Sequence, residues 1–298
     1  MLRRVTRPLR HGALFAAFLA FRAFVAVTPR RLALAVAAFL GYLAYRAGGR
    51  IRDGATRRLA ATLGCDEREA ARICRRMYGH FALSFVDLII FAGWRRRWLP
   101  RVVRVEGFEH IERAMAEGRG VVGITGHFSN WELLGGYVAR RLGGIAVLAT
   151  TAYDENFDRL AVHYRRRLGV RTIYRTEPPA APLKWLRGGR FLGVLADQDI
   201  PSLPSVVVDF LGKPARTPVG PALLARRARV PIIPMYVVRE DDNNYRVVVE
   251  PPLPKSTSRN VKQAVEEDTA AWSAAVARWV RRYPEQWVWV HDRWRLPE

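Results

Sequence analysis

Cysteine is scarce in this sequence of 298 residues. Only Cys65 and Cys74 occur, and they lie outside the C-x-x-C spacing of redox and zinc sites. We therefore expect ordinary thiols in a reducing compartment. Asp197 and Asp199 flank Gln198, but two acids without a neighbouring histidine are a weak basis for a cation site. The sequence thus predicts no metal.

A long apolar run is also missing. Two apolar segments, residues 13–27 and 32–45, are divided by Thr28-Pro29-Arg30-Arg31, and each is shorter than the roughly 20 residues of a membrane-spanning helix. Arg22 interrupts the first segment. We predict an interfacial or re-entrant helical pair that holds the chain at a membrane. A single tilted span through the proline and a cleaved signal peptide are the alternatives.

Acidic residues are few relative to basic ones. Lys and Arg number 49 and Asp and Glu 27, which gives a formal charge of +22, although half of the residues are hydrophobic. This combination favours an anionic membrane surface or an acidic partner, although an Arg-rich codon bias explains part of the excess equally well. Residues 1–60 carry a single acid, Asp53, against a set of arginines: Arg3, Arg4, Arg7, Arg10, Arg22, Arg30, Arg31, Arg46, Arg50, Arg52, Arg57 and Arg58. Such a bias predicts a cytoplasmic, lipid-facing N-terminus.

The usual marks of a nucleic-acid-binding protein are absent as well. The chain has no Lys/Arg-rich arm, no helix-turn-helix cue and no zinc-ligand spacing. Its arginines alternate with Leu and Ala, as on amphipathic faces. We therefore expect no nucleic-acid partner and keep a basic nucleic-acid-binding protein only as a remote alternative.

The hydrophobic pattern predicts an α/β fold with a mixed central sheet flanked by helices. Helical spacing covers residues 55–91 with a break at Gly64, and a long amphipathic helix covers residues 260–283. The turn-forming residues 241–244 predict a hairpin, which makes the sheet mixed. The predicted strands are residues 102–105, 121–125, 145–149, 191–196, 206–210, 232–238, 245–250 and 287–291. We divide the chain into a membrane-associated helical segment, residues 1–50, and a catalytic domain, residues 51–298.

His127 and Glu132 are the strongest candidates for chemistry. His127 follows the apolar strand 121–125, and ligands of open α/β sheets bind beyond the carboxyl ends of strands. Ser129 or Asn130 is suited to cap the next helix, whose N-terminus would then point at the same place. Glu132 would accept a hydrogen bond from one imidazole nitrogen and leave the other as a base. The plain alternative is a histidine at a strand end and a glutamate on a solvated helix face.

The stretch His127-Phe128-Ser129-Asn130-Trp131-Glu132 resembles the His-x4-Asp/Glu motif of the lysophospholipid acyltransferase superfamily, and specifically of the lipid A lauroyl/myristoyl acyltransferases. Further stretches match that family in the same order: residues 196–199, 208–214, 217–222 and 283–291. The resemblance covers most of the chain from Gly118 to Arg295.

The resemblance implies transfer of a fatty acyl group from an acyl-carrier-protein thioester to a glycolipid hydroxyl, at the cytoplasmic face of the bacterial inner membrane, with no cofactor. His127 would remove the hydroxyl proton and Glu132 would orient the imidazole. Backbone amides at the start of the Ser129 helix and the guanidinium of Arg175 would stabilise the oxyanion. Residues expected to contact substrates are Ser129, Asn130, Arg165, Arg166, Arg167, Arg175, Asp197, Gln198 and Asp199.

Other functions stay open at this point. The acceptor could be a lysophospholipid, a phosphatidylinositol mannoside or an aminolipid, and the donor could be acyl-CoA. A non-catalytic membrane scaffold with the same fold is a further alternative. His291 is expected to be a packed core histidine, and His163 lies on a polar helix.

Overall fold

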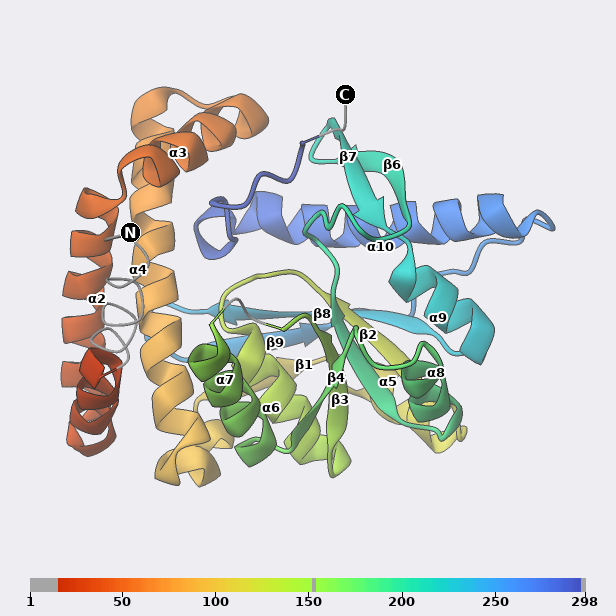
Figure 1. Ribbon diagram of the computed structural model, residues 1–298, viewed down its shortest axis with the longest axis horizontal. Coiled ribbons are helices and arrows are strands. Elements are labelled where there is room, and N and C mark those ends of the chain that lie inside the picture. Colours follow the sequence, from red (N-terminus) through yellow and green to blue (C-terminus); the bar gives the residue numbers. More distant parts are fainter. Residues whose placement is uncertain (1–15, 152–153, 296–298) are drawn as a thin grey trace, which may run out of the picture.

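The computed structural model describes residues 16–151 and 154–295. A seven-stranded sheet in the order β1-β9-β8-β2-β5-β3-β4 forms its centre (Figure 1). Its strands are β1 (Val103–Glu106), β2 (Val121–Thr125), β3 (Ile145–Ala149), β4 (Val170–Tyr174), β5 (Phe191–Leu195), β8 (Ile232–Arg239) and β9 (Tyr245–Val249). A separate hairpin joins β6 (Ser205–Phe210) to β7 (Lys213–Pro218).

The sheet is mixed, as the sequence predicts. Strands β8, β2, β5, β3 and β4 are parallel, whereas β9 runs antiparallel to β8. Residues 241–243 form the turn between these two, and Asn243 adopts a φ of 63° there, which Asn tolerates better than most residues. The predicted hairpin is therefore confirmed. Five parallel strands place five carboxyl ends along one edge of the sheet.

Helices cover both faces of the sheet. Strand residues alternate between two cores, so that Val121 packs into one hydrophobic cluster and Val122 into the other. Helices α5 (Glu109–Ala116), α6 (Trp131–Leu142) and α7 (Glu155–Arg167) contribute to the first cluster. Helices α8 (Ala180–Arg187), α9 (Gly220–Ala228) and α10 (Val261–Arg282) contribute to the second.

The N-terminal helices form a layer at one side of the sheet (Figure 1). This layer contains the helix Ala16–Val27, α2 (Arg30–Ala47), α3 (Gly49–Leu63), α4 (Glu67–Ala92) and the 3-10 helix η1 (Trp94–Arg101). Gly64 ends α3 with a φ of 67°, where a side chain would be strained. The predicted break at this glycine is confirmed, because α3 ends there and α4 begins three residues later. Helix α2 packs along α4.

No single helix among the described residues is long and apolar enough to cross a membrane. Two sharply bent pairs reach the required length and composition when taken together, α2 with α3 at 92° and α4 with η1 at 115°. The outer face of α2 exposes Leu32, Phe39 and Leu43. Residues 13–15 of the first predicted apolar segment lie outside the described residues.

Two details differ from the sequence prediction. The strand expected at residues 287–291 is reduced to one isolated bridge between Phe128 and Trp287, because the chain turns directly afterwards. Strands β4 and β7 are not among the predicted strands. Charged residues interrupt both, Arg171 in β4 and Arg216 in β7, which hides the apolar alternation expected of a strand.

Candidate active site

His127 lies two residues beyond the end of β2, and Asp197 lies two residues beyond the end of β5. Because these parallel strands are direct neighbours, the two side chains meet at the same edge of the sheet. His127 Nδ1 is 2.7 Å from Asp197 Oδ1, and the His127 backbone N–H donates to Asp197 Oδ2 at 2.8 Å. The imidazole is a quarter exposed and the carboxylate is fully buried.

Asp197 stays ionised despite its burial. Burial alone would raise the pKa of Asp197, but the His127 imidazole, the Trp287 indole and the His127 N–H outweigh that effect and lower the pKa. Trp287 Nε1 donates to Oδ2 at 2.7 Å. An ionised Asp197 favours the tautomer that carries its proton on His127 Nδ1, and in this tautomer Nε2 has a free lone pair.

Gly126 makes the approach of Asp197 possible. A Cβ at this position would lie 2.8 Å from Asp197 Oδ2 and 3.1 Å from Val276. Any side chain would therefore push the carboxylate away from the imidazole. Gly126 is needed because there is no room for a side chain, and its backbone does not adopt a left-handed conformation.

The C-terminal segment fixes the loop that carries His127. Val288 N donates to His127 O at 3.3 Å, and Ser129 N donates to Gln286 O at 2.7 Å. Ser129 adopts a φ of 47°, which a non-glycine residue keeps only when its surroundings hold it. The matched stretch 283–291 thus supplies Trp287 to Asp197 and two backbone contacts to the loop.

The expected hydrogen bond between Glu132 and the imidazole is not observed, and this expectation needs correction. Glu132 instead forms a bidentate ion pair with Arg165 of α7, with contacts of 2.9 Å from Nε and 2.5 Å from NH2. Glu132 lies in the first turn of α6, and its side chain points toward α7. The carboxylate that contacts His127 comes from Asp197, 70 residues along the chain.

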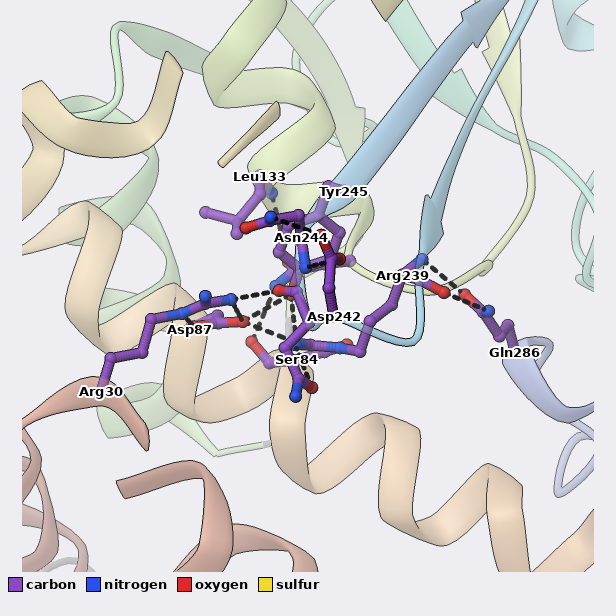
Figure 2. A network of polar contacts seen from close by, with 11 residues as sticks. Arg30, Ser84, Asp87, Leu133, Arg239, Asp242, Asn244, Tyr245 and Gln286 are labelled. Carbon is purple, nitrogen blue, oxygen red and sulfur yellow. Dashed lines mark hydrogen bonds and ion pairs between the residues drawn. The ribbon is translucent and has the colours of Figure 1, made fainter. Parts of the chain in front are cut away.

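A buried polar network anchors the start of α6 (Figure 2). Asn130 caps α6 by accepting from Leu133 N, and its Nδ2 donates to Ser84 O and Tyr245 Oη. Tyr245 in turn donates to Asp87 Oδ2 at 2.9 Å. Asp87 is fully buried and is paired with two arginines, Arg30 at 2.8 Å and Arg239 at 2.7 Å.

Sequence reasoning missed this network, although a signal was present. Asp87 stands within the apolar run 85–91 of a helix, and a buried carboxylate needs partners. Its partners come from α2, β8 and β9, so the network joins the N-terminal layer to the sheet and, through Tyr245 and Asn130, to the loop before α6 (Figure 2). The backbone carbonyl of Gln286 accepts from Ser129 N, and its side chain bonds to the backbone of Arg239: Gln286 Oε1 accepts from Arg239 N, and Gln286 Nε2 donates to Arg239 O.

A cavity of about 400 Å³ opens beside His127. Its polar residues include Glu132, Arg165 and Arg175, and its apolar wall is formed by α6 and strands β3, β4 and β5: Gly135, Val147, Leu148, Val170 and Val194. Trp131 packs edge-on against the imidazole, with ring centroids 5.1 Å apart. The cavity therefore offers an apolar interior with ionic groups beside His127, as ligand pockets commonly do.

The other predicted site residues lie at varied distances from this cavity. Gln198 and Arg175 line it, and Arg175 contacts Thr150 Oγ1 at 3.1 Å. Asp199 points to Arg216, with an ion-pair distance of 3.5 Å.

Arg165, Arg166 and Arg167 diverge, although they are consecutive. Arg165 faces the cavity, Arg166 is exposed, and Arg167 lines a different cavity. Two of the backbone amides expected to bind the oxyanion are already engaged, because Ser129 N donates to Gln286 O and Leu133 N donates to Asn130 Oδ1.

Comparison with known proteins finds similarity to bacterial lipid acyltransferases. A family model described as bacterial lipid A biosynthesis acyltransferase matches residues 5–296. A phosphatidylinositol mannoside acyltransferase of Mycobacterium tuberculosis is 29% identical over 202 residues, which cover 66% of this chain and 61% of that relative. The lipid A biosynthesis lauroyltransferase of Escherichia coli is 28% identical over 232 residues, which cover 77% of this chain and 74% of that relative.

Proposed function

Because the chain belongs to the bacterial lipid A biosynthesis acyltransferase family, we propose that it transfers a fatty acyl group from a thioester donor to a hydroxyl group of a membrane glycolipid. The observation that carries this proposal is the pairing of His127 with the buried Asp197 at the mouth of an apolar cavity. The cavity suits a hydrocarbon chain, and the histidine suits a base.

In the proposed reaction His127 Nε2 accepts the proton of the acceptor hydroxyl while the oxygen attacks the thioester carbonyl. Asp197 holds the proton on Nδ1 and stabilises the imidazolium that forms. The tetrahedral intermediate then expels the thiolate, which takes the proton from Nε2. A positioned general base of this kind contributes about 10²–10⁴-fold to the rate.

The oxyanion needs donors that are fixed beforehand. Arg165 meets this requirement, because Glu132 holds it through Nε and NH2 and leaves NH1 for the substrate. We assign Glu132 the role of fixing this guanidinium and thereby keep it in the catalytic machinery. Arg175 and Gln198, which line the same cavity, are proposed to contact the donor or acceptor head.

An acidic acyl-carrier protein is the proposed donor, because a chain with a net charge of +22 attracts an acidic partner over long range. Acyl-CoA carries the same thioester and is the alternative. Residues 1–50 are proposed to associate with the membrane at its cytoplasmic face, where both a soluble carrier and a lipid hydroxyl are within reach.

The acceptor is proposed to be a lipid A precursor, with a phosphatidylinositol mannoside as the second candidate. The first follows the family match and the relative of Escherichia coli. The second is favoured by the 29% identity to the mycobacterial relative. Mass spectrometry of lipids from cells with and without the gene distinguishes them, because one lipid class loses an acyl group.

The experiment that tests the reaction is His127→Ala, assayed with radiolabelled acyl-carrier protein and membrane lipids. We expect transfer to fall to background while the melting temperature stays near that of the wild type. His110→Ala, a partly exposed histidine of α5, is the control and should retain activity. Normal turnover by the His127 variant would refute the proposed mechanism.

A further inference from the structure

A second cavity, of about 130 Å³, lies away from the catalytic histidine. It forms where the helix Ala16–Val27, α4 and α7 all end, and η1 begins there. Its polar lining consists of Arg22, Trp94, Arg95, His163, Tyr164 and Arg167, and the described residues that line it include no carboxylate. Three like charges around one small cavity repel each other unless an anion lies between them.

Two of the three arginines that line the cavity also donate hydrogen bonds to backbone carbonyls at helix ends. Arg95 NH1 donates to Thr28 O at 3.1 Å, and Arg167 Nε donates to Ala92 O at 2.7 Å. A guanidinium has five N–H donors, so these bonds fix each arginine and leave most of its donors for another group. Arg95 is held further by stacking over Trp94, with 4.6 Å from Cζ to the ring centroid.

Two buried groups in this lining have no hydrogen-bond partner among residues 16–151 and 154–295. The hydroxyl of Tyr164 is unpaired although the residue is only 4% exposed, and Nε of Arg95 is buried and unpaired as well. Leaving such buried donors unsatisfied destabilises a folded protein. An anion in the cavity would accept from both, whereas the helix carbonyls nearby engage neither.

The helix Ala16–Val27 and η1, which both contribute to the lining, also expose apolar side chains. Val27 is 79% exposed, Trp94 56% and Phe24 40%. Trp94 packs edge-on against Trp98, and the three residues between them in sequence are all arginines. Tryptophan next to arginine is typical of the bilayer interface. We infer that this cavity binds the phosphate of an anionic phospholipid headgroup, with Phe24, Val27 and Trp94 inserted beside it.

Tyr164→Phe is the decisive variant, because it changes no charge. Because the Tyr164 hydroxyl has no partner within the described part of the chain, its removal should leave the melting temperature equal or raise it. If the hydroxyl donates to a phosphate, binding to vesicles of phosphatidylglycerol and phosphatidylcholine should weaken about tenfold, the effect of losing a hydrogen bond to a charged group.

Arg22→Gln and Arg96→Gln form a matched pair, since each removes one charge and Arg96 is exposed outside the cavity. General attraction to an anionic surface predicts similar losses for both, of about fivefold. A built site predicts a clearly larger loss for Arg22→Gln. Vesicles of pure phosphatidylcholine, in which the cationic choline group neutralises the phosphate, should bind the Tyr164, Arg22 and Arg96 variants equally well.

Inorganic phosphate distinguishes the source of the anion. We expect it to compete weakly with phosphatidylglycerol vesicles, and only in proteins with Tyr164 intact. Tyrosine-dependent phosphate binding with unchanged vesicle binding would overturn the lipid assignment, and wild-type binding of both ligands by all variants would overturn the site. Vesicle binding is measured without turnover and is repeated with the His127→Ala variant. A negative result for the lipid site can therefore be distinguished from a negative result for the proposed reaction.

Discussion

Asp197 is a charge placed inside the protein, and three donors surround it: the imidazole and backbone N–H of His127 and the indole of Trp287. Each donor also positions a part of the site. The carboxylate therefore fixes the histidine ring, the loop and the C-terminal segment at once. Removing its charge should affect the reaction before it affects the fold.

Asp197→Asn tests this role. An amide can donate to Nδ1, which favours the imidazole tautomer with its proton on Nε2, the wrong one for a base. We expect kcat to fall by about 10²–10⁴-fold with KM little changed. A steady-state assay with varied acyl-carrier protein measures both constants. Equal loss in kcat for Asp199→Asn, whose side chain points to Arg216 instead, would argue against a specific role.

The acid stability of the protein should depend on the same carboxylate. The folded pKa of Asp197 is lowered, so its stabilising contribution is complete above the unfolded pKa of about 3.9 and is lost as pH falls through the folded pKa. Urea midpoints should therefore drop less between pH 5 and pH 2 in Asp197→Asn than in the wild type. An identical decline in both proteins would show that other carboxylates dominate.

The sequence identified His127 but not its partner. A carboxylate five residues away in the motif suggested Glu132, and local spacing contains no information on which strands become neighbours. Asp197 contacts the histidine only because β5 is placed next to β2 in the sheet. For the same reason the link from Glu132 to Arg165 and the network around Asp87 could not be derived from spacing.

At the scale of elements, the contact between α2 and α4 depends on glycine. A Cβ on Gly41 would lie 2.9 Å from Tyr78 O and 3.0 Å from the Cα of Gly79, so the two backbones approach too closely for a side chain. Gly79, on α4, has open space where its own Cβ would project. The two glycines thus form a natural matched pair.

We expect Gly41→Ala to destabilise the protein and Gly79→Ala to stabilise it. Overpacking at the first position should cost about 1–3 kcal/mol, whereas alanine in the helix interior at the second should gain about 0.5–1 kcal/mol. Thermal unfolding in detergent measures both. Shifts of the same sign would show that helix propensity, not the contact between the helices, governs this layer.

Most elements were predictable because their pattern is local. The break at Gly64, the hairpin at residues 241–244 and the long C-terminal helix each follow from residue type and spacing. The structure of the segment 287–291 was not predictable in this way, because its two tryptophans are buried without forming a strand. Trp287 and Trp289 are buried side chains of a turning segment that packs against the loop carrying His127.

At the scale of the whole molecule, charge and apolar exposure occur together. The net charge of +22 attracts anionic surfaces and acidic partners over a distance set by salt. The outer face of α2 provides a short-range apolar contact through Leu32, Phe39 and Leu43. Composition predicted both properties, but only the fold shows that these three side chains share one face, opposite the residues that pack on α4.

The apolar face of α2 can be tested apart from the charge. Phe39→Gln with Leu43→Gln should weaken binding to phosphatidylcholine vesicles by about 30-fold or more, because partial burial of two large side chains is worth about 2–3 kcal/mol in total. Ala35→Gln adds the same amide at an exposed position of α2 without removing a large apolar group, so it should bind nearly as the wild type does. Neutral vesicles remove the attraction of the arginines, and flotation measures the bound fraction. If the double variant floats as well as Ala35→Gln, the membrane contact lies elsewhere on the N-terminal layer, and the cavity at Arg22 and Trp94 becomes the main point of attachment.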